Sequence, residues 1–324
     1  MKYIDMHCDT LWKAWELGVE NLNEINGTHA DITRLIKGDC KAQFFAIFFP
    51  SIEDDQYNSN TYPGDDGYFD ALYKIYRNTL IENSDKVAEA RSFDDVNKNH
   101  QNGKLSLVLT MEDGRNMLGD MSRLEKYYDL GVRVLALTWN HENCFGFPNS
   151  SDSKIMSQGL KPFGRDAVIR MNELGMIIDT SHLSDGGFWD VVELTKKPFI
   201  ASHSNCRALN PHPRSLTDEM IRALAEKGGC MGLNFASIFL TMDLSLQDST
   251  VELMMPHLKH MVKIGGIECA SIGTDLDGVS CNLEIDSADK MPFLFEGMKK
   301  AGFSDDEIEK IAYKNAERVM REVL

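Results

Sequence analysis

The sequence predicts an α/β protein built around a TIM-like (β/α)8 barrel. Two observations lead to this prediction: eight short apolar runs recur along the 324 residues, and segments of helical periodicity separate them. Such runs, bounded by Gly, Pro or Asn, are typical of strands buried on both faces, and strands that alternate with helices form parallel sheets. Barrels of ~250 residues or more fold as one unit, so we expect a single domain over residues 1–324.

The predicted strands, in chain order, are residues 3–7, 42–49, 105–111, 132–138, 176–180, 199–202, 230–234 and 270–273. Between them, residues 66–83 carry one apolar stripe, and residues 217–227 form a helix for which Thr217 is a favourable N-cap. The polar segments 58–67 and 140–159 are predicted to be loops above the barrel. A doubly wound sheet is the alternative, which the absence of Gly-x-Gly-x-x-Gly after the first strand disfavours.

Composition excludes several classes of partner. The formal net charge is −16, and an acidic surface repels phosphate backbones and anionic lipids, so neither nucleic acid nor a membrane is expected as a partner. The seven cysteines are scattered without a Cys-x-x-Cys pair, which favours free thiols in a reducing compartment. The first strand begins at residue 3 and no apolar run could span a bilayer, so we expect a cytoplasmic protein without a signal peptide.

The residues that follow the predicted strands carry the chemistry. Carboxyl ends of barrel strands share one rim, and catalytic groups lie there. Ligand-type side chains stand at five of these ends: His7 and Asp9 after the first strand, Glu112 after the third, His182 after the fifth, His203 after the sixth, and Asp275 after the eighth.

This set of residues favours a metal site. His7 and Asp9 are two positions apart, so in an extended chain they point to the same side and can bind one cation. His182 and His203 can bind a second, and Glu112 can bridge the two; ions roughly 3.5–4 Å apart would then share and deprotonate one water. Taken singly, each residue has a structural explanation, such as a hydrogen-bonded histidine at a strand end. Their joint occurrence at one rim favours the metal site.

Seven motifs, in order, also resemble one known family. They are Ile-Asp-Met-His-Cys-Asp-Thr at 4–10, Glu-Asp-Gly at 112–114, Gly-Val-Arg-Val-Leu-Ala-Leu-Thr at 131–138, Asp-Thr-Ser-His at 179–182, Ser-His-Ser at 202–204, Pro-Arg-Ser-Leu-Thr-Asp at 213–218 and Gly-Thr-Asp-Leu-Asp-Gly at 273–278. With them the whole chain resembles the membrane (renal) dipeptidases, zinc-dependent enzymes on a barrel of the amidohydrolase, or metallo-dependent hydrolase, type. It looks like a microbial, cytoplasmic member.

The resemblance implies a function and a role for each residue. The chain would be a binuclear zinc dipeptidase, with two Zn²⁺ per chain, that cleaves free dipeptides with a metal-bridging hydroxide; a homodimer is the family-like expectation. The implied roles are His7 and Asp9 at the first zinc, Glu112 as bridge, His182 and His203 at the second zinc, Arg214 at the substrate's C-terminal carboxylate, and Asp275 in proton transfer or at the free amine.

One departure from the family leaves a substrate contact open. Where the family's eukaryotic members have Leu-Thr-His after the fourth strand, this chain has Trp139, and His141 follows two residues later. We treat Trp139 and His141 as candidate substrate contacts, with His141 either donating a hydrogen bond to the oxyanion or belonging to a loop without contact. The alternative functions are a related hydrolase of N-acyl amino acids, lactams or phosphoesters, and a metal-binding module without catalysis.

Overall fold

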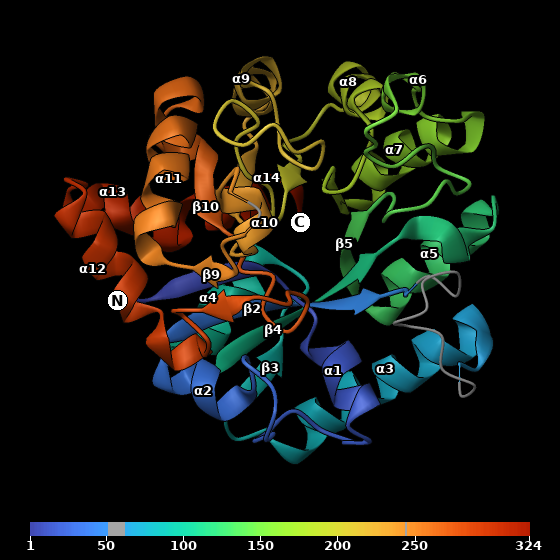
Figure 1. The fold of residues 1–324 in the computed structure, drawn as a ribbon. Coiled ribbons are helices and arrows are strands. Elements are labelled where there is room, and N and C mark those ends of the chain that lie inside the picture. The colour runs from blue at the N-terminus through green and yellow to red at the C-terminus, as the bar shows by residue number, and fades with distance from the viewer. Residues whose placement is uncertain (51–61, 244) are drawn as a thin grey trace.

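Eight parallel strands form the centre of the protein. The computed structural model describes residues 1–50, 62–243 and 245–324, and in this part of the chain the strands follow one another as hydrogen-bonded neighbours in sequence order (Figure 1). The strands are β1 (Tyr3–Cys8), β2 (Cys40–Phe48), β4 (Leu105–Glu112), β5 (Val132–Ala136), β6 (Ile177–Asp179), β7 (Ile200–Ala201), β8 (Cys230–Leu233) and β10 (Ala270–Ile272). Each coincides with a predicted run, which confirms the (β/α)8 barrel.

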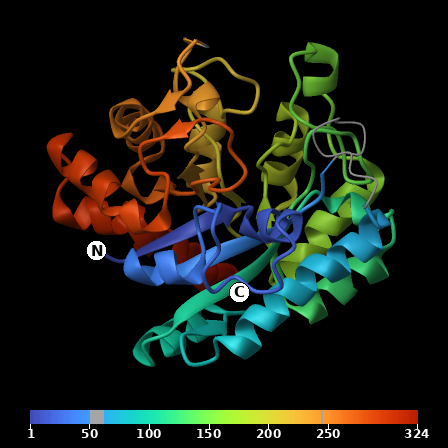
Figure 2. The same cartoon turned by 60° about the horizontal axis from the view of Figure 1, so that its bottom comes forward.

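Helices surround these strands on all sides (Figures 1 and 2). They are α1 (Thr10–Glu16), α2 (Ile32–Lys37), α3 (Gly64–Glu82), α4 (Phe93–Gln101), α5 (Met121–Leu130), α6 (Ser153–Met156), α7 (Pro162–Leu174), α8 (Asp185–Leu194), α9 (Asp218–Glu226), α10 (Ser237–Leu240), α11 (Val251–Gly265), α12 (Pro292–Lys300), α13 (Asp305–Glu309) and α14 (Asn315–Val323). As predicted, the side chain of Thr217 caps α9 by accepting the backbone N–H of Met220. The predicted loop 58–67 lies partly outside the described residues.

Three short strands were not predicted. β3 (Val87–Glu89) pairs with β4, while β9 (Asp248–Ser249) and β11 (Asn282–Leu283) pair with each other in a separate parallel ribbon. Two or three residues are too few to show a periodic pattern, so the sequence carries no signal for them. β9 and β11 belong to the segments that follow β8 and β10, on the side of the barrel where those strands end.

The barrel closes where the segment after β10 meets the end of β1, through a few backbone hydrogen bonds and one side chain instead of a full ladder. Cys8 of β1 forms an isolated bridge with Leu276, which lies four residues beyond the end of β10. Next to it the buried carboxylate of Asp5 accepts the backbone N–H of Thr274 at 2.8 Å and its hydroxyl at 2.7 Å. These bonds hold the segment after β10 beside the end of β1, so residues that are far apart in the sequence become neighbours.

The opposite end of the barrel is closed by α14. An apolar cluster there joins Ile4, Phe44 and Val108 of the strands to Val319 and Met320 of α14, which lies behind the strands in Figure 1. Burial of such side chains stabilises a protein by about 1.5–3 kcal/mol each. With this floor filled, the open rim at the carboxyl ends of the strands is the place for a site.

Two further expectations concern the thiols and the membrane. All seven cysteines are described and all are free, five of them buried. Among the described residues, no helix combines the length and the apolar character that a bilayer crossing requires.

Candidate metal centre and active site

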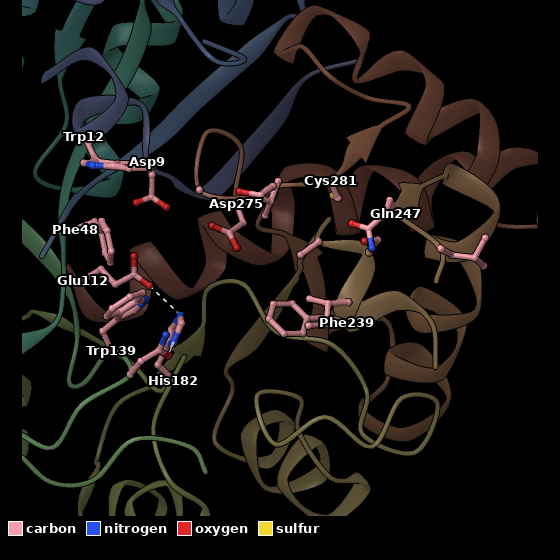
Figure 3. A pocket seen from close by; sticks show the side chains of 18 residues that line it. Asp9, Trp12, Phe48, Glu112, Trp139, His182, Phe239, Gln247, Asp275 and Cys281 are labelled. Atoms are coloured by element: carbon pink, nitrogen blue, oxygen red, sulfur yellow. Dashed lines mark hydrogen bonds and ion pairs between the residues drawn. The ribbon is translucent and has the colours of Figure 1, made fainter. Parts of the chain in front are cut away.

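Every predicted ligand lies at or just beyond the carboxyl end of a barrel strand: His7 is in β1 and Asp9 follows it, Glu112 ends β4, and His182 and His203 follow β6 and β7. Asp275, the residue predicted for proton transfer, follows β10. Figure 3 shows Asp9, Glu112, His182 and Asp275 facing one hollow. The backbones of His182 and Asp275 are left-handed, with φ of 66° and 62°. Such conformations are uncommon for residues other than glycine and gather at functional sites.

Glu112 stands at the centre of the cluster, with its two carboxylate oxygens facing different histidines. Oε1 lies 3.0 Å from Nε2 of His182 and 3.4 Å from Nε2 of His203. Oε2 lies 3.3 Å from Nε2 of His7. Glu112 is only 3% exposed, so these histidines are its main neighbours. This is the arrangement expected of a residue that gives one oxygen to each of two cations.

On the Oε2 side, His7 meets two further carboxylates. Its Nε2 lies 3.5 Å from Oδ2 of Asp9 and 3.7 Å from Oδ1 of Asp275. The turn after β10 approaches so closely that a Cβ at Gly278 would lie 2.1 Å from Oδ2 of Asp9. Only glycine fits there, because any side chain would push that carboxylate out of the cluster.

The spacing of these atoms fits zinc-sized cations. Ligands about 2.0–2.1 Å from a tetrahedral zinc ion lie about 3.3 Å from one another, close to the distances around Glu112 and His7. Nε2 of His7 and Oδ1 of Asp9 are buried but form no hydrogen bond within the described chain. Buried polar atoms normally have a partner, and a cation would supply it. The donor set of imidazoles and carboxylates is one that divalent zinc accepts.

The cluster also carries an unfavourable concentration of negative charge. Burial raises the pKa of Asp9 to about 6 and that of Asp275 to about 8, and the charge of Glu112 contributes to both increases. The neighbouring His7 opposes these shifts, and Glu112 and Asp9 in turn raise its own pKa against the effect of burial. A bound cation would relieve this repulsion and displace protons from the carboxylates.

Burial favours the neutral form of the two histidines on the Oε1 side. Burial, followed by the charge of Arg214, lowers the pKa of His182 to about 4. Burial and the charge of His7 hold the pKa of His203 well below its usual range. A neutral imidazole has a free lone pair, which metal binding requires.

Arg214 supplies a buried positive charge beside the cluster. Its side chain is 5% exposed, and Nη1 donates to Oγ of Ser204 at 2.7 Å, whereas Nε and Nη2 form no hydrogen bond in the described chain. No carboxylate of the described residues lies within ion-pair distance, although Asp275 and Glu112 are near enough to oppose the lowering of its pKa by burial. A buried guanidinium with unused donors suits recognition of an anionic group.

The cluster opens into a cavity of about 430 Å³. Trp12, Phe48 and Trp139 form an aromatic wall on one side of it, with the rings of Phe48 and Trp139 4.8 Å apart (Figure 3). Phe239 and the segment around residues 278–281 lie across from them. Trp139 therefore lines the cavity as predicted, whereas His141 is not among the described residues that do.

Backbone geometry explains the different placement of Trp139 and His141. Residues two apart share a side only while the chain is extended, and β5 ends at Ala136, before either of them. The two rings are 6.2 Å apart and tilted to one another. Of the two predictions for His141, a donor to the oxyanion and a loop residue without substrate contact, this placement favours the second.

We expect the His141→Ala substitution to change turnover only a few-fold, because the side chain lies off the cavity wall. Steady-state kinetics on a dipeptide checks this, with Trp139→Phe as the matched variant that alters the cavity wall itself. A loss of about 10²–10³-fold, the usual effect of removing one oxyanion donor, would instead establish His141 in that role.

Sequence reasoning missed the role of Asn234, a polar residue that contacts the carboxylate of Asp275. Asn234, directly after β8, donates from Nδ2 to Oδ2 of Asp275 at 2.8 Å and so orients that carboxylate. The one feature of the sequence that could have indicated this contact is the position of Asn234 at a strand end. An asparagine at such a position has many structural uses, so the position alone did not predict the contact.

A barrel of this kind, with histidines and carboxylates gathered at the carboxyl rim, defines a metal-dependent hydrolase. The chain belongs to the membrane dipeptidase family, peptidase family M19, whose family model matches residues 1–324. It is accordingly a metallo-dipeptidase, an enzyme that hydrolyses peptide bonds.

Individual relatives agree with this assignment. Dipeptidase tcpJ of Claviceps purpurea is 30% identical over 299 residues, covering 91% of this chain and 69% of that protein. An uncharacterized protein in the pqqA 5' region of Klebsiella pneumoniae is 30% identical over 272 residues, covering 81% of this chain and 98% of that protein. The structure of a metallo peptidase from Rhodobacter sphaeroides, liganded with a phosphinate mimic of L-Ala-D-Ala, has a TM-score of 0.89 at 25% identity; the match covers 100% of this chain and 99% of that one.

Proposed function

We propose that the protein hydrolyses free dipeptides with two zinc ions per chain. The observation that carries this proposal is the orientation of the Glu112 carboxylate. Its Oε2 faces His7, and its Oε1 faces His182 and His203. His7 and Asp9 would hold the first ion, His182 and His203 the second, and Glu112 both. When bound, the ions would supply a bridging hydroxide as nucleophile and polarise the scissile carbonyl group.

The remaining chemistry would come from the protein's own side chains. Asp275, held by Asn234 and directed toward His7, is placed to take the proton of the attacking water and to return it to the leaving amine. Most side chains around the reacting centre are buried, which strengthens each electrostatic interaction there.

Arg214 would select the length of the substrate. A free dipeptide has its carboxylate one residue beyond the scissile bond. In a tripeptide cut at its first bond the carboxylate lies one residue further along, which adds about 3.3–3.6 Å of extended chain. A fixed guanidinium can pair with only one of these positions. The unused donors of Arg214 support this role, and the absence of an ion pair among the described residues disfavours a purely structural one.

We expect Arg214→Met to lower kcat/KM for free dipeptides by about 10- to 150-fold, the cost of a lost charge-assisted hydrogen bond of about 1.5–3 kcal/mol. Hydrolysis of dipeptide amides, which lack the carboxylate, should change little, so the preference for free dipeptides should collapse. Parallel assays of both substrates measure this preference.

The matched control is Arg207→Met. Neither arginine is among the described residues that line the cavity, but Arg207 already pairs with both carboxylate oxygens of Asp185, at 2.7 and 2.8 Å, whereas Arg214 has unused donors beside the cluster. Its loss should affect both substrates alike. Equal hydrolysis of free and amidated dipeptides by the unchanged enzyme would exclude carboxylate recognition altogether.

A substrate panel with metal analysis tests the proposed function as a whole. The panel should include L-Ala-D-Ala, whose mimic the Rhodobacter sphaeroides structure contains, together with an N-acyl amino acid, a lactam and a phosphoester. Zinc-dependent cleavage restricted to dipeptides, with two ions per chain, supports the proposal; activity on another class alone would replace it. The single domain over residues 1–324, the homodimer and the cytoplasmic location remain predictions.

A further inference from the structure

His203 stands at one end of a buried chain of hydrogen bonds that leads away from the candidate metal centre. Its Nδ1 lies 2.7 Å from Oγ of Ser202, and that hydroxyl donates to Oδ2 of Asp179 at 2.5 Å. The three residues are 1%, 1% and 2% exposed, so water does not compete for these bonds. The chain joins the end of β6 to the beginning of the loop after β7.

The direction of the hydrogen bonds follows from the groups themselves. A carboxylate only accepts, and a hydroxyl has one proton to donate. Ser202 therefore donates to Asp179, and its oxygen is left to accept from Nδ1–H of His203. The lone pair of the imidazole is then on Nε2, the atom that lies 3.4 Å from Oε1 of Glu112.

We propose that Asp179 and Ser202 are positioning residues that hold His203 in its Nδ1–H tautomer. Nε2 is thereby ready to bind a cation as soon as the protein has folded. The inference rests on the metal centre of the proposed function, but the tautomer is a property of the protein alone. Partners of this kind commonly contribute 10- to 100-fold to metal affinity.

His182, the other histidine that faces Oε1 of Glu112, has a hydrogen-bond partner that does not fix its tautomer. Nδ1 of His182 lies 3.0 Å from the amide of Asn140, which is exposed. An amide can present either its oxygen or its nitrogen, so Asn140 accommodates both tautomers. Only the acceptor-only carboxylate of Asp179 imposes one direction, which is why the inference concerns His203.

The Asp179→Asn substitution should reverse the direction of these hydrogen bonds. Oδ1 of Asp179 accepts the backbone N–H groups of Ser181 and Ser202, each at 2.9 Å. In the variant the amide oxygen has to keep these two bonds, so the NH₂ group faces the Ser202 hydroxyl. Ser202 then accepts from the amide and turns its proton toward Nδ1 of His203, which at 2.7 Å is nearer than its other neighbour, Oγ of Ser181 at 3.3 Å. The imidazole adopts the Nε2–H tautomer, which blocks the metal-binding atom.

Zinc affinity of the single and double variants tests this reversal, measured by competition with a chromogenic chelator. Ser202→Ala only removes the preference for the Nδ1–H tautomer, so we expect it to weaken zinc binding about 10-fold. Asp179→Asn imposes the other tautomer, and we expect it to weaken zinc binding about 100-fold. The double variant should bind like Ser202→Ala, because without the hydroxyl the wrong tautomer is no longer imposed. Ser271→Ala, a fully buried serine in β10, is the matched control and should bind like the unchanged protein.

If the double variant binds zinc more weakly than Asp179→Asn does, the proposal is overturned. Two substitutions that merely damage the structure would add their effects in this way. Nitrogen-15 NMR of histidine-labelled, zinc-free protein gives a second readout that needs no folded variant of Asp179. A protonated Nδ1 on His203 supports the proposal, and a protonated Nε2 contradicts it. Failure of the unchanged protein to bind zinc would instead overturn the metal centre, without affecting the tautomer result.

Discussion

Replacing Asp275 with asparagine is expected to leave a folded protein with its metal content intact and to lower turnover by about 10²–10⁴-fold, the usual contribution of a positioned acid or base. Asparagine has the same shape and tolerates the left-handed backbone at this position, where φ is 62°. Asn234 donates to Oδ2 of the native carboxylate, so it should fix the new amide oxygen on that side. The NH₂ group would then face His7, where no proton could be taken up.

Measured kcat with zinc analysis on the same sample checks this result. The matched variant is Asp277→Asn: Asp277 is also left-handed and buried, but its carboxylate is engaged by the Thr10 hydroxyl and the His29 backbone. That variant should be less stable than the unchanged protein, and its turnover should fall by less than tenfold. Loss of zinc from Asp275→Asn would make Asp275 a ligand, and a near-normal rate would remove it from the mechanism.

The second large effect is expected from Glu112→Gln, which should deplete both metal sites at once and abolish most of the activity. An amide has one oxygen to coordinate with, and its NH₂ group repels a cation. Whichever way glutamine turns, either His7 or the pair formed by His182 and His203 loses its shared oxygen. Both cations also lose the negative charge that partly neutralised them.

Elemental analysis after dialysis against zinc should give two ions per chain for the unchanged protein and fewer than one for Glu112→Gln. His182→Ala is the control, because it should mainly empty the second site and leave close to one ion. One ion per chain in the unchanged protein, or two in Glu112→Gln, would contradict a bridging role for Glu112.

The barrel and the ligand cluster could be predicted because both depend on simple features of the chain. Strands buried on both faces are rich in apolar residues, so β2 and β4 stand out in the sequence even though they contain polar residues such as Gln43 and Thr110. Parallel strands also place their carboxyl ends together, so a histidine after β6 and another after β7 had to meet. No tertiary detail was needed for either inference.

The residues that were missed act through contacts between strands. Ser202 was visible in a motif, but its role depends on Asp179 lying beside it in the neighbouring strand, within hydrogen-bond distance. His141 shows the converse, because the predicted alternation with Trp139 stops where β5 ends. Spacing along the sequence cannot supply geometry once the chain leaves regular structure.

The helix that closes the floor of the barrel has a consequence for how the chain folds during synthesis. Ile4 and Phe44, made first, reach their apolar partners Val319 and Met320 only after the whole barrel has been translated. Contacts between such distant parts of a sequence slow folding and leave apolar strand surfaces exposed meanwhile. Until α14 has been synthesised, the apolar ends of the early strands therefore stay uncovered and can associate with other apolar surfaces.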